Sequence, residues 1–361
     1  MEKTRVRPLH QVPNGPSGIR WLGAMLIVTG LGFYLFHAAQ SPARDLKESI
    51  DLKGHSRAVQ CVAVTKDGKW LASGGLEGAL ILWDLKKREH RVLQRTKPDD
   101  VRSVAFTSDG KMLASGSGPF DNTVTLWNVM DGSTICNLKG HTLGVGSLAF
   151  SPDGKILASG SYKEIRIWDV ARHKEIATVQ GHTDHVTCLA FSPDGKTLAS
   201  GGWDNKVKLW ELSSRRERAT LEEQPGWVHS LAFTPNGKIL AVACGTNYEQ
   251  RRPIPGEIIL WDVDSRKKRG VLKGHKGAVH SIAIANDTDV LASGSADRTV
   301  RVWDISTAEE LHTFTGHHEW VQSVAITRDG RTIVSAGGDC ATCPGPAGEL
   351  KIWNVPVPTK R

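Results

Sequence analysis

Apolar and polar residues alternate in short runs along most of this chain, and each run ends at a turn signal. Within residues 186–211, the run VTCLAF is followed by the turn SPDG, then by KTLASG, a polar turn and KVKLW. Alternation with a period of two is typical of a β-strand with one buried face, and Asp-Gly pairs favour the tight turns between strands. Because no helical periodicity interrupts these runs, the pattern predicts an all-β domain over residues 48–354.

This strand pattern recurs seven times, and each copy ends in a tryptophan. One copy is GHKGAVHSIAIANDTDVLASGSADRTVRVWD, residues 274–304. The terminal tryptophans lie 44, 41, 42, 51, 42 and 50 residues apart, at Trp83, Trp127, Trp168, Trp210, Trp261, Trp303 and Trp353. A repeat of about 40 to 45 residues with four short strands is the signature of a propeller blade. The sequence therefore predicts seven blades.

The last repeat is short of one strand. After Trp353 and Asn354 only VPVPTKR remains, and its two prolines disfavour a strand. The segment ESIDLK, residues 48–53, resembles the outer strands that precede later Gly-His pairs. We expect it to complete the last blade and close the ring, which removes the exposed edges of an open sheet.

The Gly-His pair, the Asp-containing turn and the Trp-Asp ending resemble the WD-repeat family over residues 48–354. The resemblance implies a seven-bladed β-propeller in which the His, Ser, Asp and Trp of one blade are hydrogen-bonded to one another. Three blades carry the whole set: His182, Ser200, Asp204 and Trp210; His275, Ser293, Asp297 and Trp303; and His317, Ser335, Asp339 and Trp353. Buried imidazole and indole groups need such partners, so we interpret these sets as framework rather than as catalytic triads.

The other blades depart from this set. Glu77 stands where blade 1 should have Asp, blade 3 is one residue short and lacks this Asp, and blades 2 and 5 lack the Gly-His pair. Blade 5 also has LAVACG in place of LASGS. We therefore expect blade 5 to be the softest part of the ring.

An uncharged segment, WLGAMLIVTGLGFYLF, covers residues 21–36, and its neighbours extend it to roughly the 20 residues of a spanning helix. It predicts a basic tail at 1–18, one transmembrane helix as anchor at 19–39, a linker at 40–47, the propeller at 48–354 and a tail at 355–361. A cleavable signal peptide is the alternative, although no good A-x-A site follows. The four basic residues before the segment favour a single-pass protein with a cytoplasmic N-terminus and an extracytoplasmic propeller, periplasmic or extracellular.

Charge and cysteine content add little chemistry. The formal net charge is +8, of which the first twenty residues carry +3, so a solvated basic surface is favoured over a nucleic-acid site. Six cysteines in a chain of this length do not form a disulfide framework. Cys340 and Cys343 form a C-x-x-C pair, which supplies only two of four zinc ligands. An intraloop disulfide or two idle thiols are preferred, and no metal or cofactor is expected.

No catalytic motif stands out: the chain has no Gly-x-Ser-x-Gly, no phosphate-binding glycine loop and no His-Glu-x-x-His. We therefore expect a membrane-anchored scaffold, a monomeric propeller without enzymatic activity that binds a protein or peptide partner. Two alternatives remain. One is an extracytoplasmic propeller enzyme, hydrolytic or redox, and the other is a secreted binding protein that carries a signal peptide.

The resemblance also suggests where a partner would bind. In the family, the loops from outer to inner strands and from second to third strands form the top face. Trp203, Trp227 and Trp320 fall there and are not the structural tryptophans of their blades, so each either packs against a neighbouring blade or anchors a partner. The polar neighbours and the residues of the long blade-5 insertion that complete this candidate site are His185, Glu319, Tyr248, Arg251 and Arg252.

Overall fold

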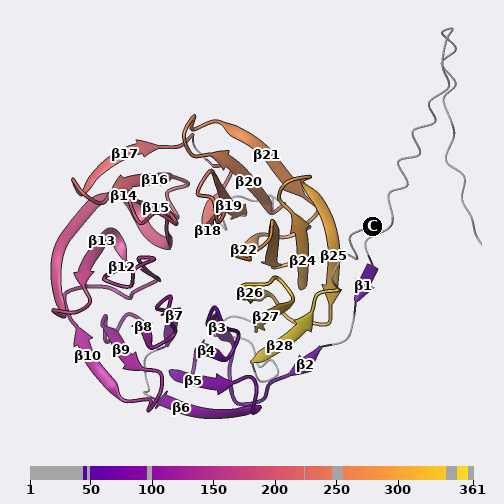
Figure 1. The fold of residues 1–361 in the computed structure, drawn as a ribbon, viewed down its shortest axis with the longest axis horizontal. Coiled ribbons are helices and arrows are strands. Elements are labelled where there is room, and N and C mark those ends of the chain that lie inside the picture. The colour runs from indigo at the N-terminus through magenta and orange to yellow at the C-terminus, as the bar shows by residue number, and fades with distance from the viewer. Residues whose placement is uncertain are drawn as a thin grey trace, which may run out of the picture. The chain divides into compact units, whose positions relative to one another are not determined.

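The computed structural model describes residues 44–46, 49–95, 100–222, 224–245, 255–338 and 348–356. All regular elements of these residues are β-strands, and seven four-stranded blades follow one another around a central axis (Figure 1). The innermost strand of each blade faces this axis, and the chain moves outward strand by strand. All the described residues belong to one compact unit, Ala43–Arg361.

The first four blades occupy the N-terminal half of the ring. Blade 1 contains β3 (Val59–Val64), β4 (Trp70–Gly75), β5 (Ala79–Asp84) and β6 (Glu89–Arg95). Blade 2 contains β7 (Val101–Phe106), β8 (Met112–Ser117), β9 (Val124–Asn128) and β10 (Thr134–Leu138). Blades 3 and 4 share one long strand, and their elements are β11 (Ser147–Phe150), β12 (Ile156–Gly160), β13 (Tyr162–Asp169), β14 (Lys174–Phe191), β15 (Thr197–Gly202), β16 (Val207–Glu211) and β17 (Arg216–Thr220).

The last three blades complete the circle. Blade 5 contains β18 (Trp227–Phe233), β19 (Ile239–Gly245), β20 (Glu257–Asp262) and β21 (Lys268–Lys273). Blade 6 contains β22 (Val279–Ile284), β23 (Val290–Ser295), β24 (Thr299–Asp304) and β25 (Glu309–Thr315), and β1 (Arg44–Leu46) adds parallel to β25. Blade 7 contains β26 (Val321–Ile326), β27 (Thr332–Gly337), β28 (Glu349–Asn354) and β2 (Ile50–Asp51).

The N-terminal strand β2 closes the ring. It pairs antiparallel with β28, with Ile50 opposite Ile352 and Asp51 opposite Lys351. The Lys351 ammonium donates to the Asp51 carboxylate at 2.8 Å across the same pair. Residues 48–53 were predicted to supply this outer strand because the C-terminal tail cannot, and the observed pairing agrees with that prediction.

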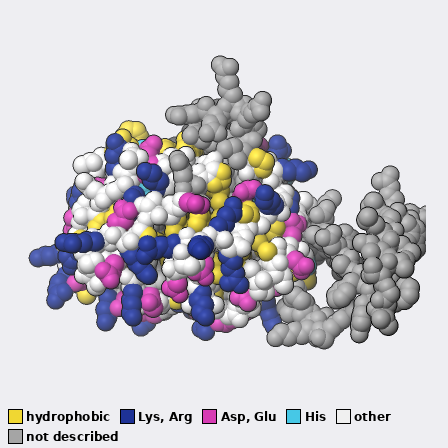
Figure 2. Space-filling model, turned by 90° about the horizontal axis from the view of Figure 1, so that it is seen from above, with side chains coloured by type: hydrophobic (Ala, Val, Ile, Leu, Met, Phe, Trp, Pro, Cys, Tyr) yellow, Lys and Arg dark blue, Asp and Glu magenta, His cyan; other side chains and the backbone are white. Residues whose placement is uncertain are grey.

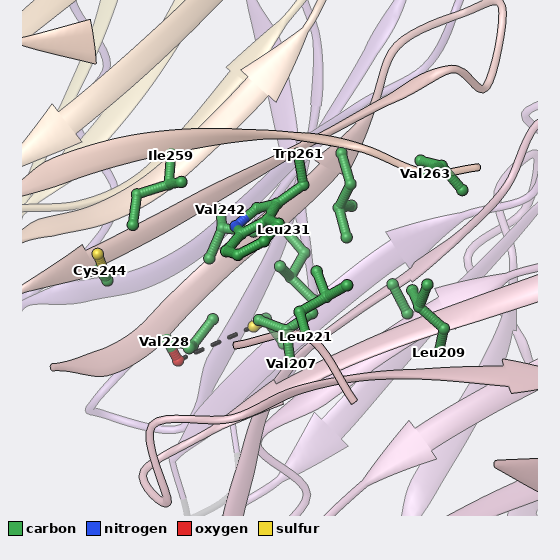
Figure 3. Close-up of a cluster of buried hydrophobic side chains, with 13 residues drawn as sticks. Val207, Leu209, Leu221, Val228, Leu231, Val242, Cys244, Ile259, Trp261 and Val263 are labelled. Carbon is green, nitrogen blue, oxygen red and sulfur yellow. Dashed lines mark hydrogen bonds between the residues drawn. The ribbon is translucent and has the colours of Figure 1, made fainter. Parts of the chain in front are cut away.

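Apolar side chains fill the spaces between neighbouring blades. The cluster between blades 4 and 5 joins Val207 and Leu209 of β16 to Val242 and Trp261 of blade 5 (Figure 3). In five blades the second strand carries a glycine where the next inner strand approaches, and blades 5 and 7 have Ala243 and Ala336 there. A Cβ on Gly201 would lie 2.4 Å from a Val228 methyl group. Close packing between blades therefore accounts for the glycine of the LASG pattern in these five blades.

The prediction of a transmembrane helix is corrected. None of the described residues forms a helix long and apolar enough to cross a membrane. Residues 19–39, which prompted the prediction, lie outside the described residues. We therefore withdraw the anchor, the single-pass topology and the extracytoplasmic placement, because all three depended on that one apolar run. The boundaries drawn at residues 18, 39, 47 and 354 stay predictions.

Candidate functional site

Several blades hold a buried histidine between a hydroxyl group and a carboxylate. In blade 4, His182 Nε2 lies 2.7 Å from Ser200 Oγ, and His182 Nδ1 lies 2.9 Å from an Asp204 oxygen. The Trp210 indole N–H donates to the same hydroxyl at 2.8 Å. Blade 6 repeats this geometry at 2.7, 2.9 and 2.8 Å with His275, Ser293, Asp297 and Trp303. We call each such group a tetrad.

Glutamate takes the place of aspartate in three tetrads. His55 Nδ1 lies 2.7 Å from Glu77, His141 Nδ1 lies 2.8 Å from Glu164, and His317 Nδ1 lies 2.8 Å from Glu349. Blade 3 lacks the turn Asp, and Glu164 supplies the carboxylate in its place. In blade 7 the predicted Asp339 lies outside the described residues, and His317 also bonds to Ser335, which accepts from Trp353. Glu77 has the same spacing from its histidine as Asp204 and Asp297, 22 residues. Glu164 and Glu349 lie 23 and 32 residues after theirs, at positions that a fixed-spacing search does not test.

The protonation states of the tetrads follow from burial and hydrogen bonding. Burial lowers the pKa of His141, His275 and His317, although the facing carboxylate opposes this effect. Burial alone would raise the pKa of the Glu349 carboxyl, but the hydrogen bonds from His317 and His318 outweigh it and lower that pKa to about 2. At neutral pH the tetrads of His275 and His317 thus combine a neutral imidazole that donates from Nδ1 with an ionised acceptor.

The tetrad hydroxyls are inaccessible. Their serines are fully buried, at 0% exposure, in all five blades: Ser73, Ser159, Ser200, Ser293 and Ser335. A serine nucleophile must meet its substrate, so these sets act as framework within their blades.

Blade 2 has a partial network, and blade 5 has none among the described residues. In blade 2 the Trp127 indole still donates to Ser115 at 2.8 Å, without a histidine. In blade 5 Val242 takes the serine position, and the Trp261 indole N–H is buried with no hydrogen-bond partner among the described residues. Apolar side chains surround this indole instead (Figure 3). The relative softness of blade 5 stays a prediction.

A continuous series of aromatic rings runs across blades 3 to 7, at the ends where second strands lead into third strands and outer strands lead into the next inner strands. We call these ends the top rim and the series the aromatic ladder. Successive ring centroids lie 4.9, 4.7, 4.9, 6.4, 5.2 and 5.8 Å apart. In order, the ladder consists of Tyr162, His185, Trp203, Trp227, His229, His280 and Trp320.

The ladder joins predicted residues to residues that the sequence analysis missed. His185, Trp203, Trp227 and Trp320 were candidates and belong to it, and Glu319 is half-buried beside Trp320 in the chain. The ladder also contains three rings that were not predicted: Tyr162, His229 and His280. The remaining candidates lie outside the described residues: Tyr248, Arg251, Arg252, Cys340 and Cys343.

A recurring β-bulge positions the two central histidines. The strand register shifts between Val228 and Ser230 and again between Val279 and Ser281, so His229 and His280 are the extra residues of bulges. A bulge changes the direction of a side chain at the end of a pairing. The equivalent positions form a column that could have been read from the repeats: Gln60, Arg102, Gly146, Thr187, His229, His280 and Gln322.

The two histidines are neutral at physiological pH. Burial lowers the pKa of His229 to about 3 and that of His280 to about 4. Nε2 of His229 and Nδ1 of His280 are buried and have no hydrogen-bond partner among the described residues. Between Trp227 and Trp320 the ladder therefore contains two uncharged polar rings, His229 and His280.

The other end of the ladder is exposed and apolar. Four large hydrophobic side chains on the top rim of blades 2 to 4 are exposed by 37% or more: Phe120, Leu143, Tyr162 and Trp203. The loops of blades 2 and 3 are in contact, since the Asn122 amide donates to the Thr142 carbonyl at 3.2 Å. Other exposed large hydrophobic side chains lie in outer strands and their turns, at Ile50, Val92, Met130 and Ile135. Figure 2 shows Lys and Arg side chains projecting from the lower edge of the ring.

Seven four-stranded blades that close through an N-terminal strand, five of them with a tetrad, define a repeat-built β-propeller. Comparison with known families agrees: the description "WD domain, G-beta repeat" matches residues 46–84, 266–304 and 308–343. The description "IFT122 first beta-propeller" matches residues 90–243. The chain belongs to the WD-repeat family, whose propellers are suited to protein–protein interaction.

Similar proteins match over part of their length. Cilia- and flagella-associated protein 52 of Bos taurus is 34% identical over 109 residues, which are 29% of this chain and 18% of that protein. Its namesake in Chlamydomonas reinhardtii is 36% identical over 99 residues, 25% of this chain and 16% of that protein. The intraflagellar transport protein 122 homolog of Danio rerio is 40% identical over 70 residues, 19% of this chain and 6% of that protein. The matches thus span less than a fifth of these relatives.

Proposed function

We propose that this chain is a non-enzymatic scaffold, a monomeric propeller that captures a protein or peptide partner on its aromatic ladder. The observation that carries the proposal is the unbroken series of seven rings, which begins at the exposed Tyr162 and crosses five blades. Aromatic side chains concentrate the binding energy of interfaces, and clustered exposed apolar residues mark interaction sites.

Framework packing alone does not account for the exposed part of the ladder. Trp203 stacks on Trp227 with the ring planes 23° apart, yet 37% of Trp203 is exposed. The structural tryptophan of the same blade, Trp210, is only 4% exposed. A large indole that contacts its neighbour and still meets solvent is typical of an interface anchor.

The relatives bear on the proposal in a limited way. Their printed names associate those proteins with cilia, flagella and intraflagellar transport. Since the matches span less than a fifth of each relative, we base the proposal on the ladder and on the repeats.

The test compares partner capture by the full chain and by ladder variants. Trp203→Ala, Trp227→Ala and Trp320→Ala should preserve the fold, and at least one should weaken capture by about 2 kcal/mol or more, close to thirtyfold in affinity. Trp70→Ala is the matched control, because Trp70 is a half-buried indole outside the ladder that contacts Lys69 and Arg91.

Proximity labelling with quantitative mass spectrometry measures the capture, and circular dichroism melting checks the fold. If all three ladder variants melt early and lose no more capture than Trp70→Ala, the ladder is framework and the proposal fails.

A further inference from the structure

We infer that the ladder recognises an arginine side chain of the partner, at a subsite formed by His229, His280, Glu319 and Trp320. This inference rests on the proposed function and adds the chemical class of the partner residue. The guanidinium would donate a hydrogen bond to His280 and lie against the neighbouring ring faces. Three properties of the subsite support it: an acceptor that requires a donor, electron-rich rings and a neighbouring carboxylate.

The first property is a buried acceptor. One nitrogen of the His280 ring hydrogen-bonds to the backbone of Val321, and this contact favours the protonated ring, so that nitrogen donates to the carbonyl. His280 is neutral, and its Nδ1 therefore carries a lone pair. That Nδ1 is buried with no hydrogen-bond partner among the described residues. A buried acceptor is stabilised by a donor, and the guanidinium offers five N–H groups.

The second property is the chemistry of the rings. His280 lies 5.2 Å from His229 and 5.8 Å from Trp320, both in edge-to-face arrangements. Aromatic faces are electron-rich and attract cations, and a planar guanidinium stacks on an indole. A carboxylate of a partner would meet the same lone pair and ring faces unfavourably.

The third property is a carboxylate within the subsite. Glu319 is half-buried next to Trp320 in the chain. A carboxylate at this position favours a cationic group over a neutral one of the same shape.

The chain itself already places cations on its aromatic rings. The Arg91 guanidinium lies 5.5 Å from the centroid of the Trp70 ring. The Lys163 ammonium lies 4.6 Å from the centroid of Tyr162, the first ring of the ladder. Arginine is favoured over lysine at His280, because only arginine combines a stacking plane with several fixed donors.

The test uses small probes rather than an unidentified partner. Full-length chain labelled with 5-fluorotryptophan is titrated with Nα-acetyl-arginine amide, and Trp320→Phe assigns the Trp320 signal in the fluorine NMR spectrum. We expect a saturable shift of that signal with a dissociation constant in the millimolar range. Nα-acetyl-citrulline amide, which keeps the shape but loses the charge, should bind at least tenfold more weakly, and the lysine analogue should be intermediate.

A matched pair of histidine variants locates the subsite. His280→Ala should weaken binding of the arginine amide at least tenfold, and His280→Asn, which keeps an acceptor, should recover part of it. His312→Ala is the control, because His312 is another half-buried histidine whose pKa is lowered by burial and whose Nδ1 is buried without a partner among the described residues. It lies in the outer strand β25, away from the ladder, and should bind like the parent chain.

Three results would overturn the inference. The first is an equal shift of the signal by the arginine and citrulline amides, and the second is equal binding by His280→Ala and His312→Ala. The third is binding that appears only in Arg251→Ala/Arg252→Ala, which would identify the occupant as a loop of this chain. If Trp320→Ala weakens partner capture while the arginine amide gives no shift, the scaffold function stands and the arginine subsite falls.

Discussion

Replacing tryptophan by phenylalanine at two equivalent positions separates the hydrogen bond of a tetrad from its packing. Trp210 in blade 4 and Trp261 in blade 5 pair with Leu198 and Leu240 of their second strands, and they are 4% and 3% exposed. The two indoles thus pack alike. They differ in that the Trp210 N–H donates to Ser200 at 2.8 Å, while the Trp261 N–H has no partner among the described residues.

The expected magnitudes follow from this difference. Trimming either indole to a phenyl ring costs about 1 to 2 kcal/mol in lost packing. Trp210→Phe also removes a buried hydrogen bond worth about 1 kcal/mol, so the total loss is roughly 2 to 3 kcal/mol. Trp261→Phe removes a donor whose unsatisfied burial costs about 1 to 3 kcal/mol, which offsets the packing loss. We expect Trp261→Phe to be close to neutral.

Equilibrium urea unfolding followed by far-UV circular dichroism measures both free energies without relying on tryptophan fluorescence. Trp303→Phe, at the equivalent position of blade 6, should repeat the loss at Trp210, because its indole also donates to a serine at 2.8 Å. The urea dependence of the unfolding free energy should be unchanged in all three variants. Equal losses at Trp261 and Trp210 would show that the tetrad hydrogen bond contributes nothing measurable.

Two further predictions concern acid and the closing strand. Stability should fall as the pH drops below about 6.5, because His229 and His280 stay neutral in the folded state, with pKa values of about 3 and about 4, while unfolded histidines take up protons. Below pH 6.5 and above these pKa values, each histidine should lower the free energy of unfolding by about 1.4 kcal/mol per pH unit. In His229→Gln/His280→Gln the free energy of unfolding should therefore depend less steeply on pH, and an unchanged dependence would contradict this. Removing residues 1–53 should lower the melting temperature more than removing 1–47, because only the first deletion removes β2 and its ion pair with Lys351. Equal melting temperatures would refute closure by β2.

Much of the architecture could be predicted from the repeat period, because each blade is built from contacts between residues that are close in the sequence. The spacing from Trp83 to Trp353 predicted the blades, and the prolines after Asn354 predicted that residues 48–53 would pair with the last blade. The apolar run at 19–39 was misread, because a segment of spanning length does not by itself establish a spanning helix.

The candidate site was predicted only in part, because the ladder consists of contacts between blades. Trp203 and Trp227 stand out within their own repeats as additional tryptophans. His229 and His280 meet only after the ring closes up and two bulges direct their side chains. Glu164 was missed for a different reason, since a flexible side chain can reach its histidine from more than one position in the turn.

Because strand β14 is uninterrupted, the connections between neighbouring blades differ in strength around the ring. Its 18 residues serve first as the outer strand of blade 3 and then as the inner strand of blade 4, so the two blades share one seven-stranded sheet. The seam at blade 7, by contrast, is closed by the two residues of β2. When the propeller is pulled or heated, we expect the ring to open first at this seam, and blades 3 and 4 to separate from each other last.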